Sequence, residues 1–330
     1  MAAITLMSSI QIPVIDLKEA ENASQRLGVA QKLVKALETD GFLFLDNVPG
    51  VDLNKVFKNS EWFFSIPETD KSQLLKKQWN PQNNNRYRGY SPLMSNCASY
   101  KEGFEIGAED VEFTDPDIHP IFKEPNVWPQ ALDKGDQFKA DMIQLFSAML
   151  KTGSEVMRLV AMGSGLDEML FEKMFSPDTL STLMLLHYPT RPDVAAAAAA
   201  TAEDGTVLSC YEHTDTGFVT LLATFDYTGL QIQSSDGQWY DVPPRPGSLI
   251  VNIGDVLSQM TGGRLKATRH RVVDPKISRY SVPFFFEPRY GVNINYRLGD
   301  SEKKTPESVC AYGPFMMDKM LQFVEYRNIL

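Results

Sequence analysis

From residue 181 onward the chain is a series of short runs rich in aliphatic, β-branched and aromatic residues. The runs read STLMLLHY, GFVTLLATF, GLQIQS, SLIVNIG, RHRVVD and YSVPFFFEP. Turn-forming stretches separate them, including the Asp-Gly pair at 236–237, PPRPG at 243–247 and TGG at 261–263. Many short strands at close spacing predict an antiparallel sandwich or barrel.

The first half of the chain has a different texture. Apolar residues recur at helical spacing in 24–40 and 51–66, in 68–77 and over much of 134–175, whereas 12–17 and 42–45 are short apolar strands. We therefore expect an α+β protein with a mainly β core. Residues 1–180 form a mainly helical region packed on a core at 181–300, and 301–330 form a C-terminal helical segment. No Gly/Ser-rich linker divides these parts, so they could fold as one unit.

An alanine run at 195–200 interrupts the series of strands. Six alanines are too few for a stable isolated helix. We interpret the run as a surface insertion between two strands, with a lid over a site as the alternative.

Composition excludes several classes of function. The formal net charge of −10 and the pI near 5.0 disfavour nucleic acid and anionic membranes as partners, because phosphates require a basic surface. The three cysteines, Cys97, Cys210 and Cys310, are odd in number and far apart, which indicates reduced thiols. The first residues lack the pattern of a signal peptide, and no apolar run reaches the roughly 20 residues of a membrane span. A cytoplasmic location is the default.

Three residues could form a metal site. His213 and Asp215 are two apart in YEHTDTGFVTLL, which has the pattern of a strand, so their side chains would share a face. His270 lies in another strand-like segment. Two histidines and a carboxylate form the facial triad of non-haem iron(II) oxygenases, which leaves open positions on the metal. A catalytic zinc site and a purely structural role for the histidines are the alternatives.

A second pair, Arg279 and Ser281, is also two apart on a strand-like run that ends in FFFEP. A guanidinium beside a hydroxyl is a good receptor for a buried carboxylate, because arginine binds carboxylates through two hydrogen bonds and stays charged. The dense apolar residues that follow indicate an interior position. The alternative is a surface arginine in a salt bridge.

At this point the chain resembles the iron(II)/2-oxoglutarate dioxygenase superfamily, in the branch that includes isopenicillin N synthase. The matching segments of the second half are LHYP, HTDTGFVTLL, GLQIQSSDGQWYDVPPRPGSLIVNIGD, TGGRLKATRHRV and RYSVPFFFEP. Those of the first half are IPVIDL, DGFLFL, NRYRGYSP, KEGFEIG and NVWP. The resemblance covers nearly the whole chain, with its motifs in the same order.

The resemblance implies a double-stranded β-helix, or jelly roll, flanked by helices. It implies Fe(II) held by His213, Asp215 and His270, and 2-oxoglutarate held by Arg279 and Ser281 with Tyr188 as a third contact. Together with O₂, these cofactors would oxidise a small organic metabolite by hydroxylation, or by desaturation, cyclisation or ring rearrangement, in secondary metabolism. Many relatives have Asn and Tyr where this chain has Leu186 and His187, which puts the details of the contacts there in doubt.

Two rival functions remain open. An oxidase similar to isopenicillin N synthase would share the triad and the Arg-x-Ser pair but use no 2-oxoglutarate. Such relatives have a glutamine near the C-terminus, and this chain ends in EYRNIL without one. The other rival is a non-catalytic ligand-binding protein on the same fold, against which the intact set of ligand residues argues.

A substrate contact is also predicted in NRYRGYSP. The position of Arg88 matches one that contacts a substrate carboxylate in relatives similar to isopenicillin N synthase. Tyr90 and Phe104 could add an apolar wall. The alternatives are that Arg88 pairs with Glu102 or Glu105, and that the two aromatic residues belong to the core.

Overall fold

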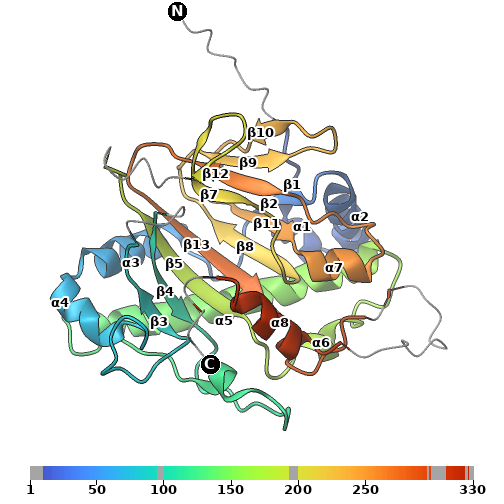
Figure 1. Cartoon of the computed structure of the whole chain (residues 1–330). Helices are drawn as coiled ribbons and strands as arrows, with labels where there is room; N and C mark the ends of the chain where they lie inside the picture. The colour runs from blue at the N-terminus through green and yellow to red at the C-terminus, as the bar shows by residue number, and fades with distance from the viewer. Residues whose placement is uncertain are drawn as a thin grey trace, which may run out of the picture.

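Two facing β-sheets form the centre of the molecule (Figure 1), as a computed structural model shows. The structure describes residues 10–94, 100–192, 200–295, 297–298, 310–323 and 326. The eight-stranded sheet has the order β1-β2-β11-β8-β13-β5-β4-β3, and the five-stranded sheet has the order β10-β9-β12-β7-β6. The larger sheet comprises β1 (Val14–Asp16), β2 (Phe42–Asp46), β3 (Gly89–Ser91), β4 (Glu102–Ile106), β5 (Thr182–Tyr188), β8 (Val219–Ala223), β11 (Leu249–Ile253) and β13 (Arg279–Phe286). The smaller sheet comprises β6 (Ala200–Thr201), β7 (Val207–His213), β9 (Leu230–Gln233), β10 (Trp239–Asp241) and β12 (His270–Val273).

Alternation along the strands explains the layered arrangement. One face of β2 and β11, with Phe42, Phe44 and Ile250, shares a buried cluster with Ile232 and Val272 of the smaller sheet. Side chains at every second position of a strand point to the same face, so this cluster fills the space between the sheets. β1 and β2 are parallel, and the other pairs are antiparallel. The predicted α+β class with a mainly β core is confirmed.

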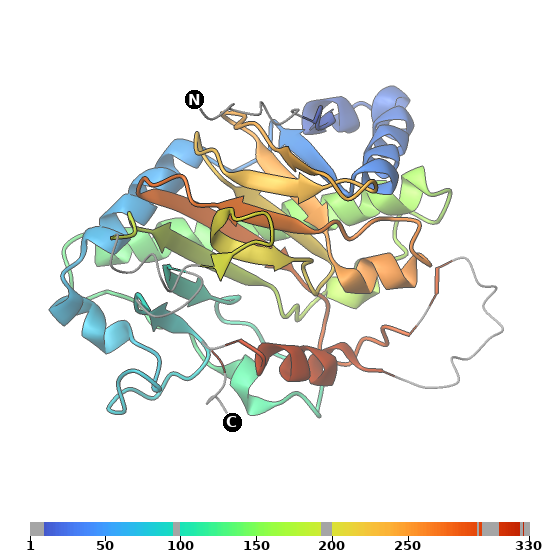
Figure 2. The same cartoon turned by 45° about the horizontal axis from the view of Figure 1, so that its top comes forward.

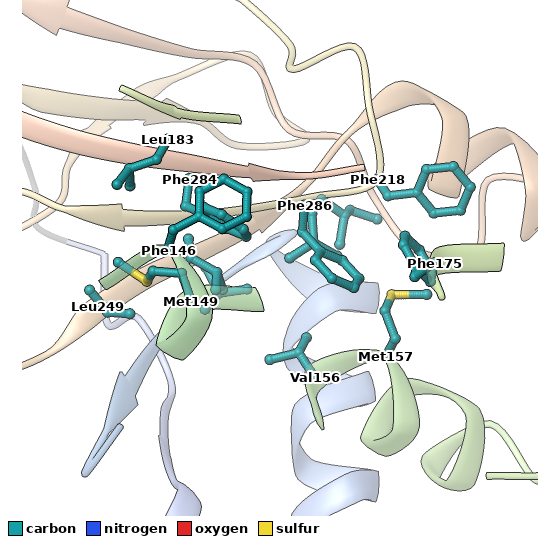
Figure 3. Close-up of a cluster of buried hydrophobic side chains, with 14 of the residues drawn as sticks. Phe146, Met149, Val156, Met157, Phe175, Leu183, Phe218, Leu249, Phe284 and Phe286 are labelled. Carbon is teal, nitrogen blue, oxygen red and sulfur yellow. The ribbon is translucent and has the colours of Figure 1, made fainter. Parts of the chain in front are cut away.

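Helices surround the two sheets, and some of them pack against the outer face of the larger sheet. They are α1 (Leu17–Glu21), α2 (Ala23–Thr39), α3 (Leu53–Ser65), α4 (Glu68–Lys71), α5 (Gly135–Gly163), α6 (Glu172–Phe175), α7 (Asp255–Met260) and α8 (Tyr312–Met320), with 3₁₀ turns at η1 (Ser72–Leu74) and η2 (Pro120–Lys123). The long helix α5 packs its apolar side chains against β13 (Figure 3). The ring centroids of Phe146 and Phe284 are 5.2 Å apart, and those of Phe175 and Phe286 are 4.2 Å apart.

The N-terminal region contributes strands as well as helices to the core. β1, β2, β3 and β4 extend the larger sheet at both of its edges, so a description of residues 1–180 as mainly helical is incomplete. The predicted helix over 68–77 is also shorter than expected. It ends early because the chain turns to pair with β3, where the backbone N–H of Lys76 donates to the carbonyl oxygen of Tyr90 at 2.9 Å.

Some predictions fall outside the described residues. The prediction of a reduced thiol at Cys97 and that of a surface insertion at the alanine run concern residues outside the described ranges, although Ala200 begins β6. Cys210 and Cys310 are free thiols. The expected C-terminal helix is present as α8, which Figure 2 shows at the lower side of the molecule. Among the described helices, none combines the length and apolarity needed to cross a bilayer.

Candidate active site

The three predicted metal ligands lie together at the end of the smaller sheet. His213 and His270 are register partners on β7 and β12, and their ring centroids are 4.2 Å apart. Nε2 of each imidazole is 3.6 Å from Oδ1 of Asp215. One ligand atom from each residue lies within 4.8 Å of the others. The structure therefore brings together two imidazoles and one carboxylate around a single point.

Hydrogen bonds turn these ligand atoms toward one another. Nδ1 of His213 donates to the carbonyl oxygen of Tyr211 at 2.8 Å, and Nδ1 of His270 donates to that of Thr268 at 3.1 Å. A proton on Nδ1 leaves the lone pair of Nε2 for a metal. Both histidines are thus in the tautomer that a metal site requires.

Asp215 is oriented in the same way. Its Oδ2 accepts hydrogen bonds from Oγ1 of Thr220 at 2.5 Å and from Nδ2 of Asn252 at 2.7 Å. Burial acts to raise the pKa of Asp215, but the two histidines and these hydrogen bonds lower it overall. The carboxylate is therefore held ionised, with Oδ1 directed at the two imidazoles.

The predicted strand geometry around Asp215 is wrong. β7 ends at His213, and Asp215 lies in the turn that leads to β8. The carbonyl oxygen of Asp215 accepts from the N–H of Asp255 at 2.8 Å, which fixes the turn against α7. The carboxylate reaches the histidines because this turn folds back, and not because strand alternation places it on their face.

The Arg-x-Ser pair lies at the start of β13. Arg279 is paired with Tyr188 of β5, and its guanidinium carbon is 5.0 Å from the centre of the tyrosine ring. Arg279, Ser281 and Tyr188 are all buried. Nε and Nη1 of Arg279 are buried and have no hydrogen-bond acceptor among the described residues. Burial lowers the pKa of Arg279. Two donor atoms of this cation are thus removed from water without a hydrogen-bond partner in the described part of the chain.

A cavity of about 440 Å³ opens beside the triad. His213 and Asp215 lie in its wall, Met184 and Phe285 add apolar surface from the larger sheet, and α8 contributes Met316. Cys210 also lies in this wall. Its Sγ is 4.0 Å from Nδ1 of His213. The cavity and the metal ligands therefore belong to one site. The buried Arg279 and Tyr188 lie on β13 and β5, the paired strands that also give Phe285 and Met184 to the cavity wall.

Comparison with known proteins identifies the family of this chain. Residues 180–288 match the family model of the 2OG-Fe(II) oxygenase superfamily, and residues 12–131 match that of the non-haem dioxygenase in morphine synthesis N-terminal region. The chain is 31% identical over 311 residues to the 2-oxoglutarate-dependent dioxygenase citB of Monascus ruber, covering 89% of each chain. The chain belongs to the 2OG-Fe(II) oxygenase superfamily. It is a 2-oxoglutarate-dependent non-haem iron dioxygenase.

Other known proteins are similar to nearly the whole chain. Isopenicillin N synthase of Penicillium chrysogenum is 28% identical over 330 residues, with 95% of this chain and 96% of that protein covered. The crystal structure of a full-length Neurospora crassa protein in complex with alpha-KG superposes with a TM-score of 0.78 at 28% identity, covering 93% of this chain and 95% of the other. The two facing sheets are thus the predicted double-stranded β-helix.

The structure gives Arg88 a different neighbourhood from the one predicted for a substrate contact. Arg88 is buried, and its Nη1 donates to Oε1 of Glu105 at 3.2 Å and to Oγ1 of Thr182 at 2.9 Å. Glu105 also accepts from Nζ of Lys76 at 2.9 Å. Glu105 and Thr182 line the cavity, but Arg88 itself lies behind them. The predicted alternative, in which Arg88 pairs with Glu105, is the arrangement found.

Tyr90 and Phe104 lie in the core and not in the wall of the cavity. The Tyr90 hydroxyl hydrogen-bonds to Glu102, and the Phe104 ring lies 4.4 Å from that of Phe63. Both side chains are almost fully buried. They are neighbours on the paired strands β3 and β4, so the sequence correctly groups them, but the sheet directs them away from the cavity.

Sequence reasoning missed four further polar residues of the site. Thr220 lies in β8 and Asn252 in β11, each as an isolated polar residue within an apolar run. This isolation is the one sequence feature that indicates a role for them in the site. Glu287 and Tyr312 meet in the cavity although they are 25 positions apart. Such a pairing depends on how α8 docks, which no local pattern encodes.

Proposed function

We propose that His213, Asp215 and His270 hold Fe(II) and that Arg279, Ser281 and Tyr188 hold the distal carboxylate of 2-oxoglutarate. The observation that carries this proposal is the buried guanidinium of Arg279, whose Nε and Nη1 have no hydrogen-bond acceptor among the described residues. A buried charge is stable only when it is paired. A carboxylate at this position would accept from Arg279, with the Ser281 hydroxyl beside it two residues along β13.

The donor set at the triad fits iron. Imidazole nitrogens and a carboxylate oxygen suit Fe(II), and three ligands on one side leave positions for 2-oxoglutarate and O₂. When bound, these groups supply the oxidising power that removes hydrogen from a substrate and transfers oxygen to it or rearranges it. The protein fixes the ligands, orients the cosubstrate through Arg279 and shields the reacting groups from water within the cavity.

The substrate that we propose is a small organic molecule. A cavity of about 440 Å³ lies in the range of pockets for metabolites. Several curated relatives are fungal 2-oxoglutarate-dependent enzymes, which supports a role in secondary metabolism. The Neurospora crassa protein has also been crystallised with alpha-KG and thymine, a molecule of this size class. We also propose that the protein is located in the cytoplasm.

The test is the Arg279→Leu variant. Loss of one partner from a buried charge pair costs about 2–5 kcal/mol, so the affinity for 2-oxoglutarate should fall on the order of 30- to 1000-fold. Calorimetry on the anaerobic Fe(II) protein measures this affinity directly and needs no substrate. Iron binding should remain normal, because Arg279 is not a ligand.

Succinate formation in the absence of the organic substrate provides a second test of the role of Arg279. Wild-type protein should convert 2-oxoglutarate slowly to succinate, and Arg279→Leu should lose this activity at low 2-oxoglutarate concentration. Unchanged affinity for 2-oxoglutarate in the variant would refute the role proposed for Arg279. Product formed by the wild type without 2-oxoglutarate would favour the oxidase chemistry of isopenicillin N synthase.

A further inference from the structure

One acidic side chain in the cavity is not among the residues that we propose for iron or 2-oxoglutarate. Glu287 directly follows β13, lines the cavity and is 5% exposed. Its carboxyl group accepts hydrogen bonds from the Tyr312 hydroxyl of α8 and from the backbone N–H of Phe218. Within the described part of the chain, no Lys, Arg or His lies at ion-pair distance from it. Glu287 is therefore a buried acid with neutral partners.

Glu287 lies next to the turn that carries an iron ligand. A Cβ atom placed on Gly217 would be 1.9 Å from Oε1 of Glu287. Only glycine therefore allows the carboxyl group to pack so closely on the backbone, two residues after Asp215. A substrate group bound to Glu287 would consequently be held at the end of the cavity where the metal ligands lie.

The charges around the cavity restrict what that group can be. Glu105, the other glutamate in the wall, is already paired with Lys76 at 2.9 Å and Arg88 at 3.2 Å. Lys101 and Lys319 also line the cavity, so its surroundings are not those of an ammonium receptor.

The state of Glu287 argues against an anion at the same place. A substrate carboxylate beside Glu287 would bring two acids together without a cation between them. Burial raises the pKa of Glu287 to about 8, so it is mostly neutral at pH 7 and can both donate and accept hydrogen bonds.

We infer that Glu287 binds an uncharged hydrogen-bonding group of the substrate, such as a hydroxyl or an amide, and so orients the neighbouring carbon toward the metal end of the cavity. This inference rests on the proposed function, because the cavity is a substrate site only if iron and 2-oxoglutarate occupy theirs. It makes Glu287 a determinant of specificity, and it assigns no anion-binding role to this end of the cavity.

Three probes of nearly equal shape test the inference: benzyl alcohol, benzoate and benzylamine. Their dissociation constants are measured by calorimetry on the anaerobic protein loaded with Fe(II) and 2-oxoglutarate. Wild-type protein should bind benzyl alcohol most tightly. Loss of one hydrogen bond should weaken benzyl alcohol binding by about 3- to 10-fold in Glu287→Leu. Glu287→Gln is the matched control, because an amide keeps both a donor and an acceptor in the same shape and should preserve most of the affinity.

Tightest binding of benzoate or benzylamine by the wild type would overturn the inference without reference to any variant. An unchanged affinity of Glu287→Leu for benzyl alcohol would also overturn it. The affinity for 2-oxoglutarate, measured in the same samples, distinguishes failure of the proposed function from failure of the inference about Glu287. If the wild type does not bind 2-oxoglutarate, the proposed function fails. If all variants bind 2-oxoglutarate but the affinities of the probes do not depend on Glu287, only this inference fails.

Discussion

Asn252 shows how residues that touch neither metal nor substrate set the geometry of the iron site. Its Nδ2 donates to Oδ2 of Asp215, which leaves Oδ1 for the metal. Replacement of such a partner typically lowers metal affinity about 10- to 100-fold. We therefore expect Asn252→Leu to fold normally but to bind Fe(II) more weakly by that factor, as measured by competition with a chelator. Asn59→Leu removes a similar amide bonded to the distant Asp141, and it should leave iron affinity unchanged.

A second prediction at this scale concerns Glu287 and stability. Its pKa is raised from 4.5 to about 8 on folding, so the folded state holds the proton more tightly than the unfolded state does. The free energy of unfolding should consequently fall as pH rises from about 5 to 8. In Glu287→Gln this contribution is absent, so stability relative to wild type should improve by more than about 1 kcal/mol over that interval. Denaturant unfolding of the metal-free proteins measures this difference in the free energy of unfolding. Parallel pH profiles for the two proteins would contradict the prediction.

The individual site residues differ in how far the sequence predicts them. His213, Asp215 and His270 are predictable because ligand chemistry limits metal sites to a few residue types. Arg279 is predictable because a charged residue within an apolar strand needs a buried partner. Arg88 illustrates the limit, since its partner Glu105 lies 17 positions away and only the pairing of β3 with β4 decides which way the guanidinium turns.

Two elements, β13 and α8, border the cavity from different sides. β13 carries the proposed 2-oxoglutarate anchor at its start and presents Phe285 and then Glu287 to the cavity at its end. α8 closes the cavity from the other side. Beyond it, Tyr326 donates to Oε2 of Glu105 at 2.6 Å, and Nζ of Lys76 is 4.4 Å from the centre of its ring. Tyr326 is thus linked to a buried charge network.

This attachment predicts how α8 moves. A hydrogen bond to a charged group contributes about 1.5–3 kcal/mol, so Tyr326→Phe should increase the local opening of α8 on the order of 10- to 100-fold. Hydrogen exchange across residues 312–320 measures this opening. The control is Tyr240→Phe, which removes a hydroxyl from the opposite sheet and should leave exchange in α8 unchanged. Equal exchange in wild type and Tyr326→Phe would mean that the attachment does not restrain the helix.

At the scale of the whole molecule, the order of the larger sheet explains which parts of the fold the sequence predicts. Short apolar runs between turn residues predict β5, β8, β11 and β13, because these strands are buried for most of their length. The same reasoning misses β4, whose segment KEGFEIG contains two acids. Those acids are tolerated because Lys71 and Lys76 pair with them inside the protein. The division at residue 180 remains a prediction, and the strands on either side of it share one sheet.

The central claim is that this chain binds one Fe(II) through the triad and one 2-oxoglutarate through Arg279 on that metal. Anaerobic titration tests it most directly, with iron content and 2-oxoglutarate binding measured on the same samples of wild type and of the His213→Ala/Asp215→Ala double variant. The account predicts about one iron per wild-type chain and 2-oxoglutarate binding that depends on it, with both lost in a double variant that stays folded. Stoichiometric iron in the double variant, or 2-oxoglutarate binding that ignores the metal, would contradict it.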